Sequence, residues 1–241
     1  MYDIENYYNA STIEEAVRLL KEHPDTRVIS GGSDVLIKIR EGKMAGTSLV
    51  SIRDIKELNG ITKKENGDIY IGAGTTFSHI TNDPVIQENI PVLGEAVDQV
   101  GGPQIRNIGT IGGNICNGAV SADSAPTVFS LNALLRIEDG NNGRTVPVRD
   151  FYLGPGRVDL KRGEILTHVI IPAKEYQGYH GNYIKYSMRK AMDIATLSCS
   201  VVSKVNTEKN ILEDVRITFG VAAPVPFRCE KTEAALKGQE I

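Results

Sequence analysis

Two glycine-rich turns are the residues of this sequence whose types and spacing best suit ligand binding. They read S-G-G-S-D at residues 30–34 and T-I-G-G-N at residues 110–114. Glycine reaches positive φ without strain, so backbone amides in such turns can point into one concavity and bind phosphate oxygens. Neither turn is a Walker loop or a G-x-G-x-x-G motif. Two such turns favour a pyrophosphate over a single phosphate, and two ordinary tight turns are the alternative interpretation.

Other residue patterns that carry chemistry are weak. The four histidines have no metal-ligand spacing, and no G-x-S-x-G motif or hydrolytic pair of carboxylates is present. Cys116, Cys199 and Cys229 lie far apart and form no C-x-x-C pair, so we expect no metal or iron–sulfur site within this chain. Cys116, Asp123 and Lys185 each allow two interpretations. Each could contact a ligand. Otherwise Cys116 would be a packing residue, Asp123 a carboxylate at a helix N-terminus, and Lys185 a solvated strand residue.

Composition narrows the class of protein. The chain has 241 residues, 41% of them hydrophobic, with 27 Lys and Arg against 30 Asp and Glu, giving a net charge of −3. This balance gives no support to nucleic-acid binding, and no apolar run is long enough to cross a membrane. The scattered cysteines favour a reducing, cytoplasmic location. The length allows one large domain or two smaller ones.

The first turn is expected between a strand and a helix. Ser11 and Glu14 form a capping box that begins a helix ending near residue 23, and a strand follows at residues 27–30. Ser33 or Asp34 then caps a second helix. The second turn lies in residues 101–114, which hold too much glycine for a helix, so we expect a packed loop there.

The remaining patterns predict a mixed chain followed by a β-rich end. Helices are expected at 76–81, 84–89, from 91 onward and at 122–131, and strands at 49–52, 69–71 and 164–171. The G-N-N-G segment at 140–143 predicts a hairpin. Strands at 183–188, 197–205 and 215–221 and a helix at 230–237 follow. A boundary in residues 173–181 divides the chain into domains 1–175 and 176–241.

Several segments together resemble one protein family. Both turns are similar to the paired FAD signatures of the flavoprotein subunits of molybdenum hydroxylases, which include the medium subunits of carbon monoxide dehydrogenase and of bacterial xanthine dehydrogenases. The similarity is greatest to the xanthine dehydrogenase branch and covers nearly the whole chain. The other matching segments are residues 71–76, 104–109, 114–118, 152–156, 185–189, 192–195 and 219–224.

The resemblance implies an α+β fold. Its first part would be a two-lobed FAD-binding domain of the vanillyl-alcohol-oxidase (PCMH) type, with two α/β halves and the flavin between them. A small α+β C-terminal domain with an antiparallel sheet would follow. We expect this second domain to be incomplete, because the helices that usually complete it in the family are missing from the sequence.

The resemblance also implies positions for cofactor contacts. The first turn would wrap the pyrophosphate and the second would bring amides to its opposite side. Cys116 would lie near the isoalloxazine ring, Asp123 would bond the cofactor, and Ile165 would touch the flavin through its backbone. Lys185 would reach the flavin from the second domain. The full set is Arg27, Val28, Ile29, Ser30, Gly31, Gly32, Ser33, Asp34, Thr110, Ile111, Gly112, Gly113, Asn114, Cys116, Asp123, Ile165 and Lys185.

The family's function implies partners. FAD would be held by this chain, while molybdopterin would be held by a large subunit and [2Fe–2S] clusters by a small subunit. Electrons would pass from those clusters through FAD to NAD⁺ or another acceptor. The complex would then serve a reaction such as xanthine oxidation in purine metabolism. Two alternatives remain open at this point. The chain could be a self-sufficient flavin oxidoreductase, such as an enolpyruvyl-sugar reductase, or a nucleotide-binding module without a redox cofactor.

Overall fold

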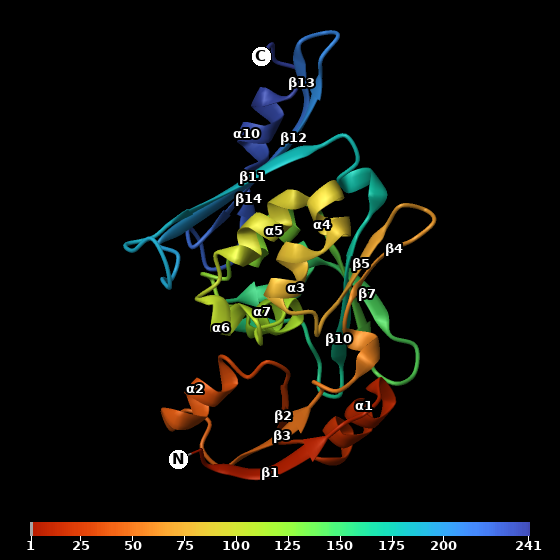
Figure 1. Cartoon of the computed structure of the whole chain (residues 1–241), viewed down its shortest axis with the longest axis vertical. Helices are drawn as coiled ribbons and strands as arrows, with labels where there is room; N and C mark the ends of the chain where they lie inside the picture. The colour runs from red at the N-terminus through yellow and green to blue at the C-terminus, as the bar shows by residue number, and fades with distance from the viewer. Residues whose placement is uncertain (1) are drawn as a thin grey trace.

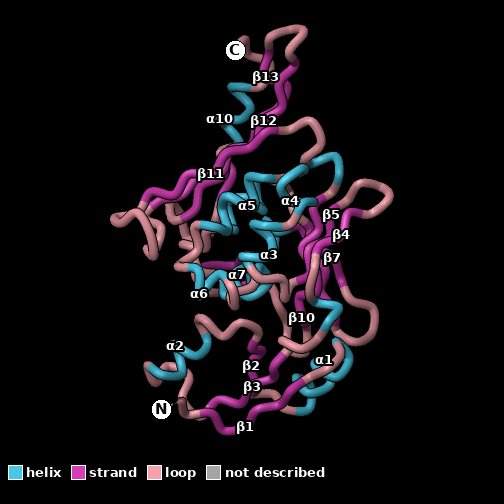
Figure 2. The backbone as a smooth tube through the Cα atoms, in the orientation of Figure 1, coloured by secondary structure: helices cyan, strands magenta, loops and turns pink. Residues whose placement is uncertain are grey.

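Three sheets of three or more strands follow one another along the long axis of the molecule, in chain order (Figure 1). The computed structural model describes residues 2–241. The first sheet belongs to an N-terminal lobe, the second to a central lobe, and the third to the C-terminal part of the chain. The helices α3 to α7 lie together beside the strands of the central lobe (Figure 2).

The first lobe is a three-stranded parallel sheet of order β1-β3-β2. Parallel neighbours need crossover connections, and two helices supply them. Its elements are β1 (Ile4–Asn9), α1 (Ile13–Glu22), β2 (Thr26–Ile29), α2 (Val35–Arg40) and β3 (Thr47–Ser51). The apolar face of α1 is buried against β3, and Ile39 of α2 is buried with Ile29 and Leu49.

The cap of α1 differs by one residue from the prediction of Ser11 and Glu14. Thr12 is the N-cap, and its side chain accepts a hydrogen bond from the Glu15 amide. The Glu15 carboxylate in turn accepts hydrogen bonds from the amide and hydroxyl of Ser11. The sequence S-T-I-E-E contains two overlapping boxes, and the chain uses the second, which places Ile13 at the start of the helix.

The second lobe is a five-stranded antiparallel sheet of order β4-β5-β10-β6-β7. Its strands are β4 (Ile61–Lys63), β5 (Ile69–Gly72), β6 (Leu134–Glu138), β7 (Arg144–Pro147) and β10 (Ile165–Ile171). The predicted hairpin is confirmed, and the Asp139 carboxylate accepts hydrogen bonds from the amides of residues 141–143 in its turn. This lobe is therefore antiparallel, unlike the βαβ arrangement of the first.

Most helices of this lobe lie between β5 and β6 in the chain. They are α3 (Phe77–Asn82), α4 (Pro84–Asn89), α5 (Pro91–Asp98), α6 (Pro103–Arg106), α7 (Ile111–Asn117) and α8 (Ser124–Ser130). The prediction of an irregular loop at 101–114 is wrong in part, because α6 and the start of α7 fall there. Pro103 is favoured in the first turn of α6, and a Cβ at Gly112 would come within 2.5 Å of Ala73. The glycine in α7 therefore serves close packing.

The C-terminal part is a four-stranded antiparallel sheet of order β11-β12-β13-β14. Its elements are β11 (His180–Tyr186), β12 (Leu197–Asn206), β13 (Ile211–Gly220), β14 (Phe227–Arg228) and α10 (Glu230–Leu236). One face of this sheet packs on α5 and α8 of the second lobe. Tyr183 and Val202 belong to the same buried cluster as Ile69 and Leu135, so the core is continuous from the second lobe into this sheet.

Short elements complete the chain. They are η1 (Lys56–Leu58), α9 (Val148–Phe151), β8 (Tyr152–Gly154), β9 (Arg157–Val158) and η2 (Ala173–Glu175). The linker that follows β10 is fixed by an ionic network, because Arg216 pairs with Glu175 at 3.0 Å and stacks on the Tyr179 ring. The C-terminal sheet is thereby held at a defined position on the second lobe.

Candidate functional site

The first glycine-rich turn lies against the segment that leads into the second. Residues 30–34 connect β2 to α2 and extend from the first lobe towards α6 and α7 (Figure 1). A Cβ at Gly31 would lie 1.9 Å from the backbone oxygen of Ile108, so only glycine fits there. The two turns, 80 residues apart in sequence, are therefore neighbours at the junction of the lobes.

The first turn presents backbone amides that the protein does not use. Within residues 2–241, the amides of residues 31–34 donate to no protein acceptor. Gly32 has φ +76°, and Asp34, at the N-cap of α2, makes no side-chain capping bond. Successive amides around a left-handed residue form an anion-binding nest. This turn therefore suits the diphosphate of a dinucleotide.

The second turn is different, because most of its amides are used inside the protein. The Ile111 amide donates to Thr75 at 3.1 Å, and the Gly112 amide donates to Ala73 at 2.9 Å. The Gly113 amide donates to the Thr110 hydroxyl, and the Asn114 amide to the Thr110 carbonyl. The expectation that this turn offers a row of amides does not describe the structure. Its remaining donors within the described chain are the Thr110 amide, the Thr110 hydroxyl, which only accepts from Gly113, and the Asn114 side-chain nitrogen.

Asp123 and Lys185 meet in a buried ion pair. The Lys185 ammonium donates to Asp123 Oδ2 at 2.9 Å, and both side chains are under 10% exposed. The interpretation of Lys185 as a solvated residue is therefore wrong. The Tyr183 hydroxyl donates to Asp123 Oδ1 at 2.8 Å, and Lys185 also donates to the Gln99 carbonyl. Burial raises the pKa of Asp123, and hydrogen bonds from Lys185 and Tyr183 act in the opposite direction.

The carboxylate and the second turn are linked through one residue. Ser124, adjacent to Asp123 at the start of α8, donates its hydroxyl to Asn114 Oδ1 at 2.6 Å. The structure thus connects the predicted residues pairwise: the first turn contacts Ile108 and Gly109 just before Thr110, Asn114 contacts Ser124, and Asp123 contacts Lys185. The predicted residues come from three parts of the chain: the first lobe, the second lobe and β11.

The remaining predicted residues lie around this arrangement. Arg27, Val28 and Ile29 lie in β2, where they pair with β3. They precede the first turn in the chain and are not part of it. The Ile165 side chain, at the start of β10, is buried in the first-lobe core. Cys116 on α7 packs against the second-lobe core, and burial raises the pKa of its thiol to about 12. The thiol is therefore neutral at physiological pH.

Three polar residues at this junction were not among the predicted contacts. Tyr183 holds the buried carboxylate, and the Lys38 ammonium of α2 donates to Asn117 Oδ1 at 2.8 Å, which ties α2 to α7. Arg106 donates to the carbonyls of Val100 and Gly101 after α5. The sequence signal for Tyr183 was its spacing of two from Lys185, which places both on one face of a strand.

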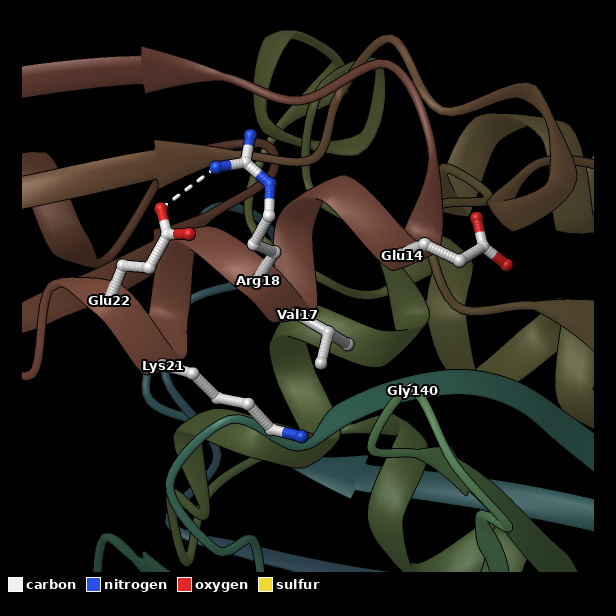
Figure 3. Close-up of a pocket in the computed structure, with 6 residues that line it drawn as sticks. All are labelled: Glu14, Val17, Arg18, Lys21, Glu22 and Gly140. Atoms are coloured by element: carbon white, nitrogen blue, oxygen red, sulfur yellow. Dashed lines mark hydrogen bonds and ion pairs between the residues drawn. The ribbon is translucent and has the colours of Figure 1, made fainter.

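A shallow surface pocket of about 320 Å³ lies away from this junction. It is formed by α1 and the tip of the β6–β7 hairpin, and Figure 3 shows its charged residues, with Arg18 paired to Glu22. It contains none of the predicted cofactor contacts. No helix within residues 2–241 is long and apolar enough to span a bilayer.

The fold and the site define a flavoprotein. Residues 2–174 match the FAD binding domain in molybdopterin dehydrogenase, and residues 182–241 match the CO dehydrogenase flavoprotein C-terminal domain. The chain belongs to the FAD-binding medium subunits of the molybdenum hydroxylases. It is thus an oxidoreductase component whose own cofactor is FAD.

Named relatives support this assignment. The chain is 39% identical to the xanthine dehydrogenase FAD-binding subunit of Escherichia coli O157:H7, over 97% of this chain and 79% of that one. It is 32% identical to the carbon monoxide dehydrogenase medium chain of Hydrogenophaga pseudoflava, over 97% and 80%. A solved structure of carbon monoxide dehydrogenase from that organism superposes with a TM-score of 0.94 at 31% identity, covering 100% of this chain and 83% of that one.

Proposed function

We propose that this chain is the electron-transfer subunit of a xanthine dehydrogenase-like complex. Electrons would reach its FAD from [2Fe–2S] clusters on a small subunit and leave to NAD⁺ or another acceptor. Molybdopterin would lie on a large subunit, where the organic substrate is oxidised. The support is the similarity to a xanthine dehydrogenase FAD-binding subunit and to chains named as medium chains. A cytoplasmic location and a role in purine metabolism belong to the same proposal.

The open amides of the first turn are the observation that carries the binding assignment. Residues 31–34 offer successive N–H groups, and the close approach of Gly31 to Ile108 and Gly109 brings this turn to the segment that leads into Thr110. We assign the diphosphate to this place, with Ser30 and Ser33 as hydroxyl donors beside it. Asp123, Lys185, Cys116 and Ile165 would contact the rest of the cofactor. The same proposal divides the chain into an FAD-binding domain, 1–175, and a C-terminal domain, 176–241, a division supported by the two family matches.

The protein's own residues bind, orient and exclude water in this scheme. FAD, when bound, supplies the redox chemistry as a two-electron carrier that also exchanges single electrons. The open amides of the first turn would hold the anion with few cations, since neutral donors lower the cost of burying its charge. The buried Asp123–Lys185 pair adds no net charge to the site.

FAD reconstitution of the purified chain tests the proposal. We expect a yellow protein whose flavin spectrum survives gel filtration, and reduction of that flavin by an iron–sulfur partner but not by purine substrate alone. A chain that binds ADP but retains no flavin would instead be a nucleotide-binding module. Turnover of an organic substrate by the isolated chain with NADPH would indicate a self-sufficient oxidoreductase. Co-purification with molybdopterin- and iron-containing subunits would support the partners.

A further inference from the structure

One strand of the C-terminal sheet places two hydrogen-bond donors on a single carboxylate of the FAD-binding domain. Tyr183 and Lys185 are two residues apart in β11, so both side chains point to the inner face of the sheet. The Tyr183 hydroxyl donates to Oδ1 of Asp123 at 2.8 Å, and the Lys185 ammonium donates to Oδ2 at 2.9 Å. Each carboxylate oxygen therefore has one donor from β11.

This contact is buried and spans the two parts of the chain. Tyr183 is 5% exposed and Asp123 is 6% exposed. Lys185 has a second acceptor in the Gln99 carbonyl at the end of α5, so its position is fixed without Tyr183. Within residues 2–241, the Tyr183 hydroxyl makes no hydrogen bond other than that to Asp123, and the nearby hydroxyl of Ser198 is buried without a partner. The hydroxyl of Tyr183 is thus dedicated to Asp123.

A carboxylate has about four acceptor positions, and the two donors from β11 occupy one on each oxygen. With donors on both oxygens, rotation about the Cβ–Cγ bond of Asp123 is restricted. The remaining lone pairs then point in one fixed set of directions. A single donor, from Lys185 alone, would leave the carboxylate plane free to turn about that bond.

We propose that Tyr183 is a positioning residue that fixes the Asp123 carboxylate for its hydrogen bond to FAD. The inference rests on the proposed function, because it takes Asp123 as a cofactor contact. It adds that the C-terminal domain contributes to the flavin site through two side chains, one of which acts only through Asp123.

The ionisation of Asp123 gives a second consequence. The titratable groups facing it are Tyr183 and Lys185 on β11, with the Cys199 thiol of β12 near Tyr183. Burial raises the pKa of Asp123, and the Tyr183 hydrogen bond is one of the interactions that lower it. Removing the hydroxyl therefore raises this pKa further. The protonated carboxyl group, a poorer acceptor, then persists to higher pH. As the pH is lowered, FAD affinity therefore begins to decline at a higher pH in the variant than in the wild type.

The test compares Tyr183→Phe with a matched control, Tyr179→Phe. Tyr179 also donates its hydroxyl to an aspartate, Asp214, at 2.8 Å, outside the proposed flavin site. FAD dissociation constants of the full chain are measured by flavin fluorescence between pH 5 and 8. We expect Tyr183→Phe to weaken FAD binding about 10-fold at pH 7.5. The loss of FAD affinity at acid pH should also begin at a higher pH in this variant. Tyr179→Phe should match the wild type in both respects.

A double-mutant cycle separates positioning from a general loss of packing. In an Asp123→Ala background, which has no acceptor for the Tyr183 hydroxyl, Tyr183→Phe should have no further effect on the FAD dissociation constant or on the flavin circular dichroism spectrum. Wild-type affinity and pH profile in Tyr183→Phe, or additive effects in the cycle, would overturn the inference while leaving the proposed function intact. Failure of the wild-type chain to bind FAD would overturn the proposed function and, with it, the role assigned to Tyr183.

Discussion

At the scale of single residues, the glycines of the two turns differ in the space around their Cα atoms and in whether neighbouring amides are free to donate. Gly31 permits the contact with Ile108, and Gly32 turns the chain so that the following amides remain open. Gly112 permits the packing of α7 on Ala73, whereas a Cβ at Gly113 would meet only the Thr110 hydroxyl, at 3.0 Å. Among the glycines of the two turns, Gly31 and Gly112 are therefore the positions where substitution must displace backbone.

Gly31→Ala should weaken FAD binding by at least about 100-fold, because its Cβ would overlap the Ile108 carbonyl and push the amide nest away from Thr110. Titration of the apo-protein with FAD measures the change. Gly94→Ala in α5 is the control, since its Cβ would make only ordinary contacts, 3.5 Å from Ile86 of α4 and 3.7 Å from Thr81 of α3. Equal FAD affinity in Gly31→Ala and Gly94→Ala would contradict the assignment of the diphosphate to the first turn.

Glu164, immediately before Ile165, should make stability depend on pH. Its burial alone would raise its pKa, but hydrogen bonds from Arg144 and from the Lys161 amide outweigh this and lower the pKa. A lowered folded-state pKa gives stability that is present above the unfolded pKa and lost as the pH falls through the folded value. Glu164→Gln should cost about 2 kcal/mol at pH 7 and much less below pH 4, by urea unfolding.

The exposed pair of Arg18 and Glu22 on α1 provides the comparison for Glu164. Its ion pair is as short, at 2.8 Å, but both side chains are at least half exposed. Glu22→Gln should therefore change the free energy of unfolding by less than about 0.5 kcal/mol at either pH. A cost for Glu164→Gln that is no larger, or one that grows as the pH falls, would show that the Arg144 network does not stabilise the fold.

At the scale of elements, sequence patterns located most of the fold but not helices α6 and α7. The helix at 84–89, the 134–147 hairpin and strand β10 follow apolar periodicity and turn residues, so they could be predicted. Helices α6 and α7 could not, because α6 has only four residues and α7 has seven with two glycines. Such short helices are marginal alone and depend on contacts such as that of Gly112 with Ala73. The motifs located both turns. The spacing of Tyr183 from Lys185 places the two on one face of β11, but no local pattern pairs Tyr183 with Asp123, 60 residues away.

The tie between α2 and α7 should matter for cofactor affinity. Helix α2 has six residues and follows the open turn directly, so the Lys38–Asn117 hydrogen bond helps to hold that turn in place. Lys38→Met should weaken FAD binding about 5-fold, the effect of one lost hydrogen bond. Lys43→Met, which removes an exposed ion pair with Glu41, is the control. Identical FAD titrations for both variants would show that α2 is positioned by its apolar contacts alone.

At the scale of the whole molecule, the buried clusters are unequal. The largest joins the second lobe to the C-terminal sheet, whereas the first lobe has two smaller clusters and shares Ile165 with its neighbour. The first lobe is therefore expected to open more readily than the rest, since local opening follows the extent of buried contacts. A cofactor held between the lobes would stabilise the closed arrangement by about 2.7 kcal/mol at 100 times its dissociation constant.

Amide hydrogen exchange can follow this coupling without any substitution. In the apo-protein, residues 26–40 should exchange faster than β10 and β12, because they belong to the smaller clusters. ADP carries the diphosphate but no isoalloxazine, so it should protect the first turn and leave residues 183–185 unchanged. FAD should protect both, since Asp123 and Lys185 are assigned to the flavin end. Protection of both segments by ADP, or of the first turn alone by FAD, would contradict the placement of the cofactor across the lobe junction and against β11.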